Sequence, residues 1–254
     1  MSKPSAYTFM TDIKIPPSQG IYEESTTQQA PLGARITVGD RTFVYAKLST
    51  SANVAAGFIV CAPQLIASHQ SGIVACASAS AGSKTITITA GTLFTANQYA
   101  EGYIGVALSA SAGAGLMLRI KSHPAIATAA TGAITLYDEV PYVIAGGPVN
   151  FVPNQFADVK VASAALDRPV GVTPVAVTTG NYFWLQTYGP AAMRHVAANA
   201  ADALLTLGTL GAATVGLNAT TNDAFAPILA VVGRNMNLAA TAAQANPAFI
   251  TLMP

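Results

Sequence analysis

The residues of this chain that could perform chemistry are few and far apart. Histidine is a common general base and metal ligand, and the three histidines are His69, His123 and His195. They are separated by 54 and 72 residues, so no two have the short spacing of a metal site. The pattern is typical of isolated surface or hydrogen-bonded histidines and predicts no metal site, although a cluster formed by the fold stays open.

Acidic residues are equally scattered, and only Glu23–Glu24 and Asp138–Glu139 are adjacent pairs. Neighbouring residues in a strand point to opposite faces, so neither pair indicates an acid/base dyad. The Asp138–Glu139 pair precedes Val-Pro and is typical of a turn, with a Ca²⁺ site as a minor alternative. The sequence has no nucleophile elbow and no phosphate-binding loop. We therefore predict no enzyme and no cofactor. The enzymatic alternative is a β-fold glycan hydrolase, which needs two carboxylates about 5–10 Å apart in a cleft.

The two cysteines each end a short apolar run, at Cys61 and Cys76. Such positions predict two buried small hydrophobic side chains. A disulfide between neighbouring strands is the alternative.

The elements that must position these residues are predicted to be strands. The segment Lys84–Ala90 alternates isoleucine and threonine, which is the period of a half-buried strand. The runs Arg35–Val38 and Arg41–Lys47 flank Gly39-Asp40 and predict a hairpin. Further short apolar runs recur with turn signals about every 8–12 residues. We expect an all-β fold, an antiparallel sandwich or barrel, with Ala191–Leu205 as the best candidate for a helix.

The strongest predicted strand is Gly180–Gly189, which carries the only tryptophan. Tyr182 and Trp184 share one face of this strand and Phe183 lies on the other. The interpretation favoured here is core packing on one side and a cross-strand aromatic pair on the other. A sugar-binding or intersubunit platform is the alternative.

The chain is predicted to have three parts. Residues 1–31 form an extended arm, because its four prolines block regular helix. Residues 32–158 form a β-rich lobe that ends in a Pro- and Gly-rich connector, and residues 159–254 form a second β-rich lobe. We expect the arm to dock on a neighbouring subunit, although a frayed terminus is the alternative. The predicted contact residues are Tyr7, Phe9, Ile13, Ile15, Pro16, Pro17 and Tyr22.

The composition favours a subunit that packs against neighbours. Only 9% of the residues are charged, against roughly 25% in typical domains. The net charge of +1 gives no electrostatic basis for binding nucleic acid. No secretory signal is visible, and the uncharged run Ala203–Asn222 is too polar to span a membrane.

Several stretches resemble structural proteins of tailed-phage virions, especially capsid decoration (cement) proteins. They are Pro31–Lys47, Thr92–Tyr103, Leu118–Ala125, Ile134–Asp138, Val152–Phe156, Pro169–Pro174 and Gly180–Pro190. The resemblance implies a β-rich homo-oligomer, preferably a trimer, that is made in the host cytoplasm. It would bind the outer surface of the capsid through the major capsid protein and need no cofactor. A head fibre, tail or receptor-binding component is the alternative.

Overall fold

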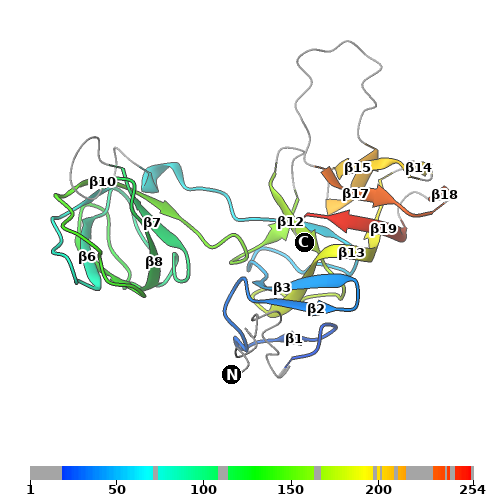
Figure 1. Cartoon of the computed structure of the whole chain (residues 1–254), viewed down its shortest axis with the longest axis horizontal. Helices are drawn as coiled ribbons and strands as arrows, with labels where there is room; N and C mark the ends of the chain where they lie inside the picture. The colour runs from blue at the N-terminus through cyan, green and yellow to red at the C-terminus, as the bar shows by residue number, and fades with distance from the viewer. Residues whose placement is uncertain are drawn as a thin grey trace, which may run out of the picture. The chain divides into compact units, whose positions relative to one another are not determined.

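The computed structural model shows an almost entirely antiparallel β protein (Figure 1). It describes residues 19–70, 74–107, 114–162, 167–196, 199–200, 202–208, 211–215, 231–237, 239–240 and 244–252. The one named helical element within these ranges is the short 3-10 turn η1, Ala67–His69. The predicted all-β class is therefore confirmed. No helix in the described ranges is long and apolar enough to cross a membrane.

The chain forms two compact units whose boundaries differ from those of the predicted lobes. One unit contains Met1–Ala62 together with Phe156–Pro254, and the other contains Pro63–Gln155. The second unit is thus inserted into the first. Residues 32–62 belong with the C-terminal part of the chain instead of with the segment that follows them.

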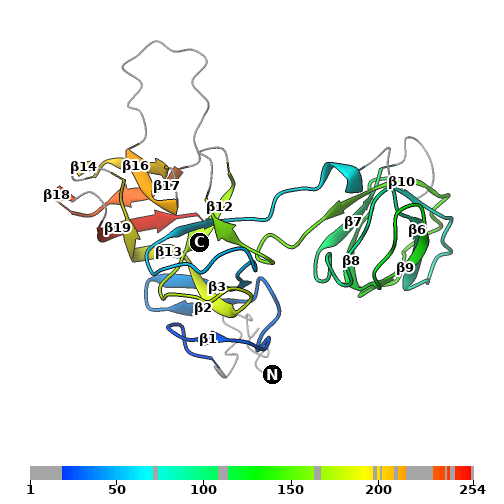
Figure 2. The ribbon, with the colours of Figure 1, turned by 180° about the vertical axis from the view of Figure 1, so that it is seen from behind.

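Unit 2 is a closed six-stranded barrel with the strand order β10-β5-β6-β9-β8-β7 (Figures 1 and 2). Its strands are β5 (Ala75–Cys76), β6 (Thr85–Thr89), β7 (Tyr103–Val106), β8 (Met117–Ser122), β9 (Thr131–Leu136) and β10 (Gly147–Val152). The segment predicted as a connector, Asp138–Asp158, instead contains β10, which pairs with both β5 and β7 and closes the barrel. Its proline at position 148 and its glycines at 146 and 147 lie at the start of that strand.

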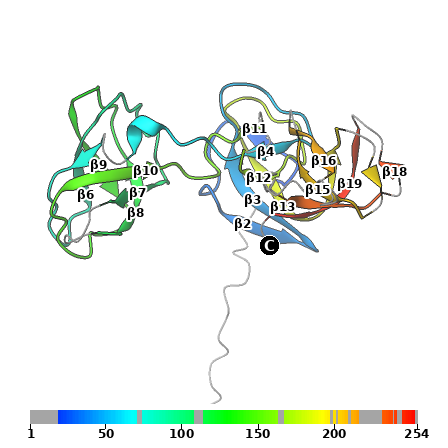
Figure 3. The ribbon, with the colours of Figure 1, turned by 90° about the horizontal axis from the view of Figure 1, so that it is seen from above.

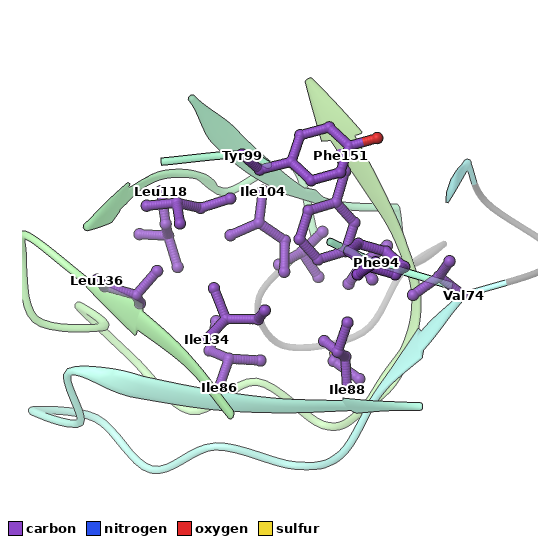
Figure 4. Packing of buried hydrophobic residues seen from close by; sticks show 14 of the residues in the cluster. Val74, Ile86, Ile88, Phe94, Tyr99, Ile104, Leu118, Ile134, Leu136 and Phe151 are labelled. Carbon is purple, nitrogen blue, oxygen red and sulfur yellow. The ribbon is translucent and has the colours of Figure 1, made fainter. Parts of the chain in front are cut away.

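Alternation of side chains builds the barrel core. In β6 the isoleucines Ile86 and Ile88 are buried while the threonines on either side are exposed, as the sequence predicts. The same period brings Ile104, Leu118 and Ile134 inward from β7, β8 and β9 (Figure 4). The barrel is filled by apolar side chains and is a packed core.

Unit 1 is organised around one long strand, β13 (Tyr182–Arg194) (Figure 3). This strand pairs with β1 (Glu24–Ser25), β3 (Arg41–Lys47), β12 (Pro169–Val172) and β19 (Ala245–Thr251). The remaining strands of the sheet are β2 (Arg35–Val38), β4 (Ile59–Cys61), β11 (Lys160–Val161), β15 (Leu204–Leu207), β16 (Ala213–Val215) and β17 (Val231–Asn235). The short strands β14 (Asn199–Ala200) and β18 (Ala239–Ala240) pair with each other. The predicted hairpin is confirmed as β2–β3.

The best candidate for a helix, Ala191–Leu205, contains no helix where the structure describes it. Its first four residues, Ala191–Arg194, continue β13 and pair with β19, and Leu204 begins β15. Alanine favours helix in isolation, but pairing with a neighbouring strand overrides that preference here. Gly189 permits the extension, because it has a positive φ of 90° and a Cβ there would lie 2.4 Å from the Asp40 carbonyl.

Two of the three apolar clusters of unit 1 lie on opposite faces of β3. Val44 and Ala46 pack into one apolar cluster with Phe183 and Leu185 of β13. Phe43 and Tyr45 face the other way and pack with Trp184. A strand buried on both faces requires a second layer on each side, and residues 21–36 supply part of it.

The cysteines lie in different units, Cys61 in β4 and Cys76 in β5. Both are free and buried, which confirms the prediction of two buried small side chains. The alternative of a disulfide between neighbouring strands is not found.

Candidate interaction surface at the root of the N-terminal arm

The described chain begins at Gln19, whose side chain is buried in unit 1 and only 4% exposed. Its Nε2 donates hydrogen bonds to the carbonyl oxygens of Glu23 and Tyr182, both at 2.9 Å. Its Oε1 accepts the Tyr45 hydroxyl at 2.7 Å, and its own carbonyl accepts Trp184 Nε1 at 3.0 Å. One residue therefore joins the start of the described chain to two strands of the central sheet.

The next residues are also bound to their own unit. Glu24 lies in β1, and its carboxylate accepts hydrogen bonds from the backbone N–H of Thr178 at 2.6 Å and from the Thr178 hydroxyl at 3.0 Å. Burial raises the pKa of Glu24, but hydrogen bonds from Thr178 and Asn181 outweigh it and leave the pKa below its ordinary value. The part of the predicted arm from residue 19 to 31 is thus built into unit 1.

Of the seven predicted contact residues, the structure describes only Tyr22. Its side chain is exposed, and its hydroxyl accepts a hydrogen bond from Arg41 Nη1 at 2.8 Å. The other six, Tyr7, Phe9, Ile13, Ile15, Pro16 and Pro17, lie outside the described residues.

Tyr22 and Arg41 help to line a cavity of about 240 Å³ in unit 1. Its remaining lining is Ala56, Gly57, Val172, Thr173, Pro174, Gln186, Pro190, Ala191, Ala192 and Ala245. The polar groups of this lining are already engaged, because Thr173 donates to the Ala55 carbonyl at 2.7 Å and Gln186 to the Pro190 carbonyl at 2.8 Å. The cavity is therefore lined mainly by apolar atoms, with the cation of Arg41 among its residues.

The structure shows a buried histidine pair that sequence spacing did not reveal. In unit 2, His69 Nδ1 lies 2.7 Å from the Tyr99 hydroxyl, and the Tyr99 backbone N–H donates to His123 Nε2 at 3.1 Å. His123 Nδ1 is 2.9 Å from the Pro124 carbonyl. Burial lowers the pKa of both histidines. Fifty-four residues separate the two, so only barrel closure brings them together.

This histidine pair has the geometry of core packing. The ring of His69 stacks on Phe94 with the centroids 3.9 Å apart, and both histidines are buried. His195 belongs to unit 1 and is also buried, which lowers its pKa. The described residues contain no group of three or more potential metal ligands from His, Cys, Asp and Glu.

The aromatic run of β13 lies in the core. Trp184 is 2% exposed, and its cross-strand partner is Tyr45. The two rings pack edge-on with their centroids 5.0 Å apart. Phe183 joins the cluster on the opposite face. The prediction of core packing with a cross-strand aromatic pair is confirmed. An exposed sugar platform at Trp184 is not what the structure shows.

Carboxylates do not gather at the cavity. Within the described part of the chain, the lining of the cavity includes no Asp or Glu. Glu139 lies in the other unit and faces Lys84 at 3.9 Å. The pair of carboxylates in a cleft that glycan hydrolysis requires has no counterpart at this cavity.

Comparison with protein families, curated proteins and solved structures finds no match to this chain.

Proposed function

We propose that this chain is a structural subunit of a tailed-phage virion that decorates the outer face of the capsid as a homo-oligomer. The observation that carries the proposal is a surface poor in charge and rich in exposed apolar side chains on a well-packed β framework. Such a surface is typical of a protein that is covered by neighbours in an assembly. The resemblance of residues 31–190 to virion proteins supports the same class.

The exposed apolar side chains occur in both units. Those of unit 2 are Leu65, Ile66, Leu93, Tyr103, Met117, Tyr137, Tyr142 and Val143. Those of unit 1 are Tyr22, Val38, Val196, Leu204, Val231 and Met236. The described residues form three ion pairs, with N–O distances of 3.4–3.9 Å, so exposed charge pairing contributes little to stability.

The root of the arm supports a tether. Gln19 fixes the point at which residues 1–18 join unit 1. Eighteen residues can span at most about 60 Å, and six of the predicted apolar contact residues lie in this segment. An arm of this kind would add weak contacts to those of the body, and linked weak contacts give avidity without one strong site.

The deletion that tests the arm should end at residue 18. Removing residues 1–30 would also remove Gln19 and β1, which are part of the sheet of unit 1. We expect the 1–18 deletion to leave unit 1 folded and to reduce capsid binding. Normal decoration by the truncated chain would refute the tether.

The direct test is a cryo-EM map of phage particles whose genome encodes the chain. Density for the chain on the outer shell, across junctions of the capsid protein, is the expected result. Density only on the tail or a fibre would replace the decoration role with another virion role. Absence from the particle would refute the proposal.

A further inference from the structure

The outer face of the barrel carries a row of side chains that crosses four adjacent strands. The registers align Val152 of β10 with Tyr103 of β7, and Tyr103 with Arg119 of β8. Tyr137 follows β9 and lies beside Arg119, because its N–H donates to the Arg119 carbonyl at 3.0 Å. Directly opposed residues share a face of a sheet. We call Val152, Tyr103, Arg119 and Tyr137 the aromatic–arginine row.

The row points away from the core. The neighbours of its members along the strands, Ile104, Leu118, Ile120 and Leu136, all belong to the buried cluster of the barrel. Tyr103 and Tyr137 are 40% and 41% exposed, respectively. The face is therefore an apolar surface that the described chain leaves open to solvent.

A methionine widens the apolar surface. Met117 of β8 is 56% exposed and is paired with Gly105 of β7. A Cβ at position 105 would lie 2.8 Å from Met117 Sδ, so the glycine allows the methionine side chain to lie across β7. By contrast, β6 presents Thr85, Thr87 and Thr89 to solvent. The outer face of β7 and β8 thus carries larger and more adaptable side chains than that of β6.

The arginine of the row is held in place by an aromatic ring and lies near a carboxylate. Its guanidinium carbon lies 4.9 Å from the centre of the Tyr137 ring, and Nη2 lies 3.7 Å from Glu101 Oε2. The 3.7 Å separation exceeds hydrogen-bond distance. Nε is buried and has no hydrogen-bond partner among the described residues. An arginine fixed by an aromatic ring loses little side-chain freedom on binding, which suits it to an interface.

The charge of this face favours an acidic partner. Arg119 and Lys121 both point outward from β8, and Glu101 lies beside Arg119. On β8 the two cations thus outnumber the carboxylate at Arg119, while Asp138 and Glu139 follow Tyr137 and Glu139 faces Lys84. Tyrosine and arginine are the residue types that most often dominate binding energy at protein interfaces.

We propose that the aromatic–arginine row, with Met117, is the surface through which the barrel docks on the capsid protein, at a site that offers a carboxylate amid apolar side chains. This inference rests on the decoration function proposed above. It assigns the lattice contact to unit 2 and leaves the arm of unit 1 as a separate contact.

The test measures binding of the full-length chain to phage heads that lack it. The variants are Tyr103→Ser, Tyr137→Ser and Arg119→Gln, all at side chains with exposed surface, so the barrel is expected to stay folded. Lys84→Gln is the matched control, because Lys84 also lies in unit 2 and has one carboxylate neighbour, Glu139. Each row variant should weaken binding at least tenfold, and the control should change it less than twofold. Circular dichroism verifies that each variant is folded.

The outcomes separate this inference from the function on which it rests. If the wild-type chain fails to bind the heads, the decoration proposal and this inference both fall. If the wild-type chain binds and the row variants bind equally well, the row is not the docking surface and decoration stands. An equal loss in Arg119→Gln and Lys84→Gln would indicate long-range charge attraction and overturn the inference. A change in oligomer mass by light scattering, with head binding unaltered, would show that a second copy covers the row.

Discussion

Replacing Gln19 with alanine should destabilise unit 1 far more than an ordinary change near a chain end. The substitution removes two donors and one acceptor from a buried site. It leaves the Tyr45 hydroxyl hydrogen and the Tyr182 carbonyl without these partners. Each buried polar group left unsatisfied costs about 1–3 kcal/mol. Because water can partly refill the space, we expect a loss of about 2–4 kcal/mol in the free energy of unfolding.

Fluorescence of Trp184 during urea unfolding provides the assay. The only tryptophan lies in unit 1 and donates its indole N–H to Gln19, so its emission reports this unit and this site. With a urea slope of about 2 kcal/mol per molar, the midpoint should fall by about 1–2 M. Gln29→Ala is the matched control, because that side chain is exposed and bonds only locally to Thr27. The control should shift the free energy by less than about 0.5 kcal/mol.

A double-mutant cycle isolates the hydrogen bond between Gln19 and Tyr45. Tyr45→Phe should cost about 1–2 kcal/mol in the wild-type chain, since it leaves Gln19 Oε1 unpaired. In the Gln19→Ala background the same change should cost less, because one of the two partners of the hydroxyl is already gone while the Gln29 N–H, which donates to it at 3.0 Å, remains. Equal midpoints for Gln19→Ala and Gln29→Ala, or additive costs in the cycle, would refute this account of the arm root.

Three further predictions follow from the described residues. Burial lowers the pKa values of His69 and His123, so both should titrate below pH 6.5 in NMR spectra of the folded chain. Because the unfolded chain then binds protons more readily, the free energy of unfolding of the barrel should fall as the pH drops below 6.5 and should not change above it. Titration of either ring at 6.5 or higher would contradict this. Burial raises the pKa of Cys61 to about 12 and also raises that of Cys76. A thiol reagent at pH 8 should therefore label neither cysteine until denaturant is added. Rapid labelling of the native chain would show that the sites open. Gly233→Ala should lower the urea midpoint of unit 1, because a Cβ at position 233 would lie 2.0 Å from a backbone carbonyl oxygen of β19. An unchanged midpoint would show that β17 and β19 can separate freely.

The sequence predicted the elements whose cause is local. The alternation of isoleucine and threonine in β6 reflects burial of one face, and the hairpin around Gly39 reflects turn chemistry. Each of these signals is contained in a short stretch of neighbouring residues. The all-β class follows from many such signals.

The features that sequence reasoning missed depend on contacts distant in the chain. Ala191 resembles a helical residue until its pairing with Ala248 is known. The two units could not be seen, because unit 1 joins segments on both sides of the barrel. Nothing in the neighbourhood of Gln19 indicates that it bonds to Tyr182, 163 residues away. For the candidate site, therefore, the sequence identified Tyr22 but not the buried amide that fixes its segment.

The separation of the proposed contacts explains why this chain shows so little chemistry. The arm root belongs to unit 1 and the aromatic–arginine row to unit 2, and the chain passes between the units once in each direction. Two linked contacts multiply their affinities through effective concentration, so neither has to be strong. Weak contacts can be made from apolar side chains and a few fixed donors, and they do not require clusters of titratable groups. The polar groups buried in the barrel, the paired histidines, then serve packing, and charge can stay scarce on a surface that the proposed assembly would cover.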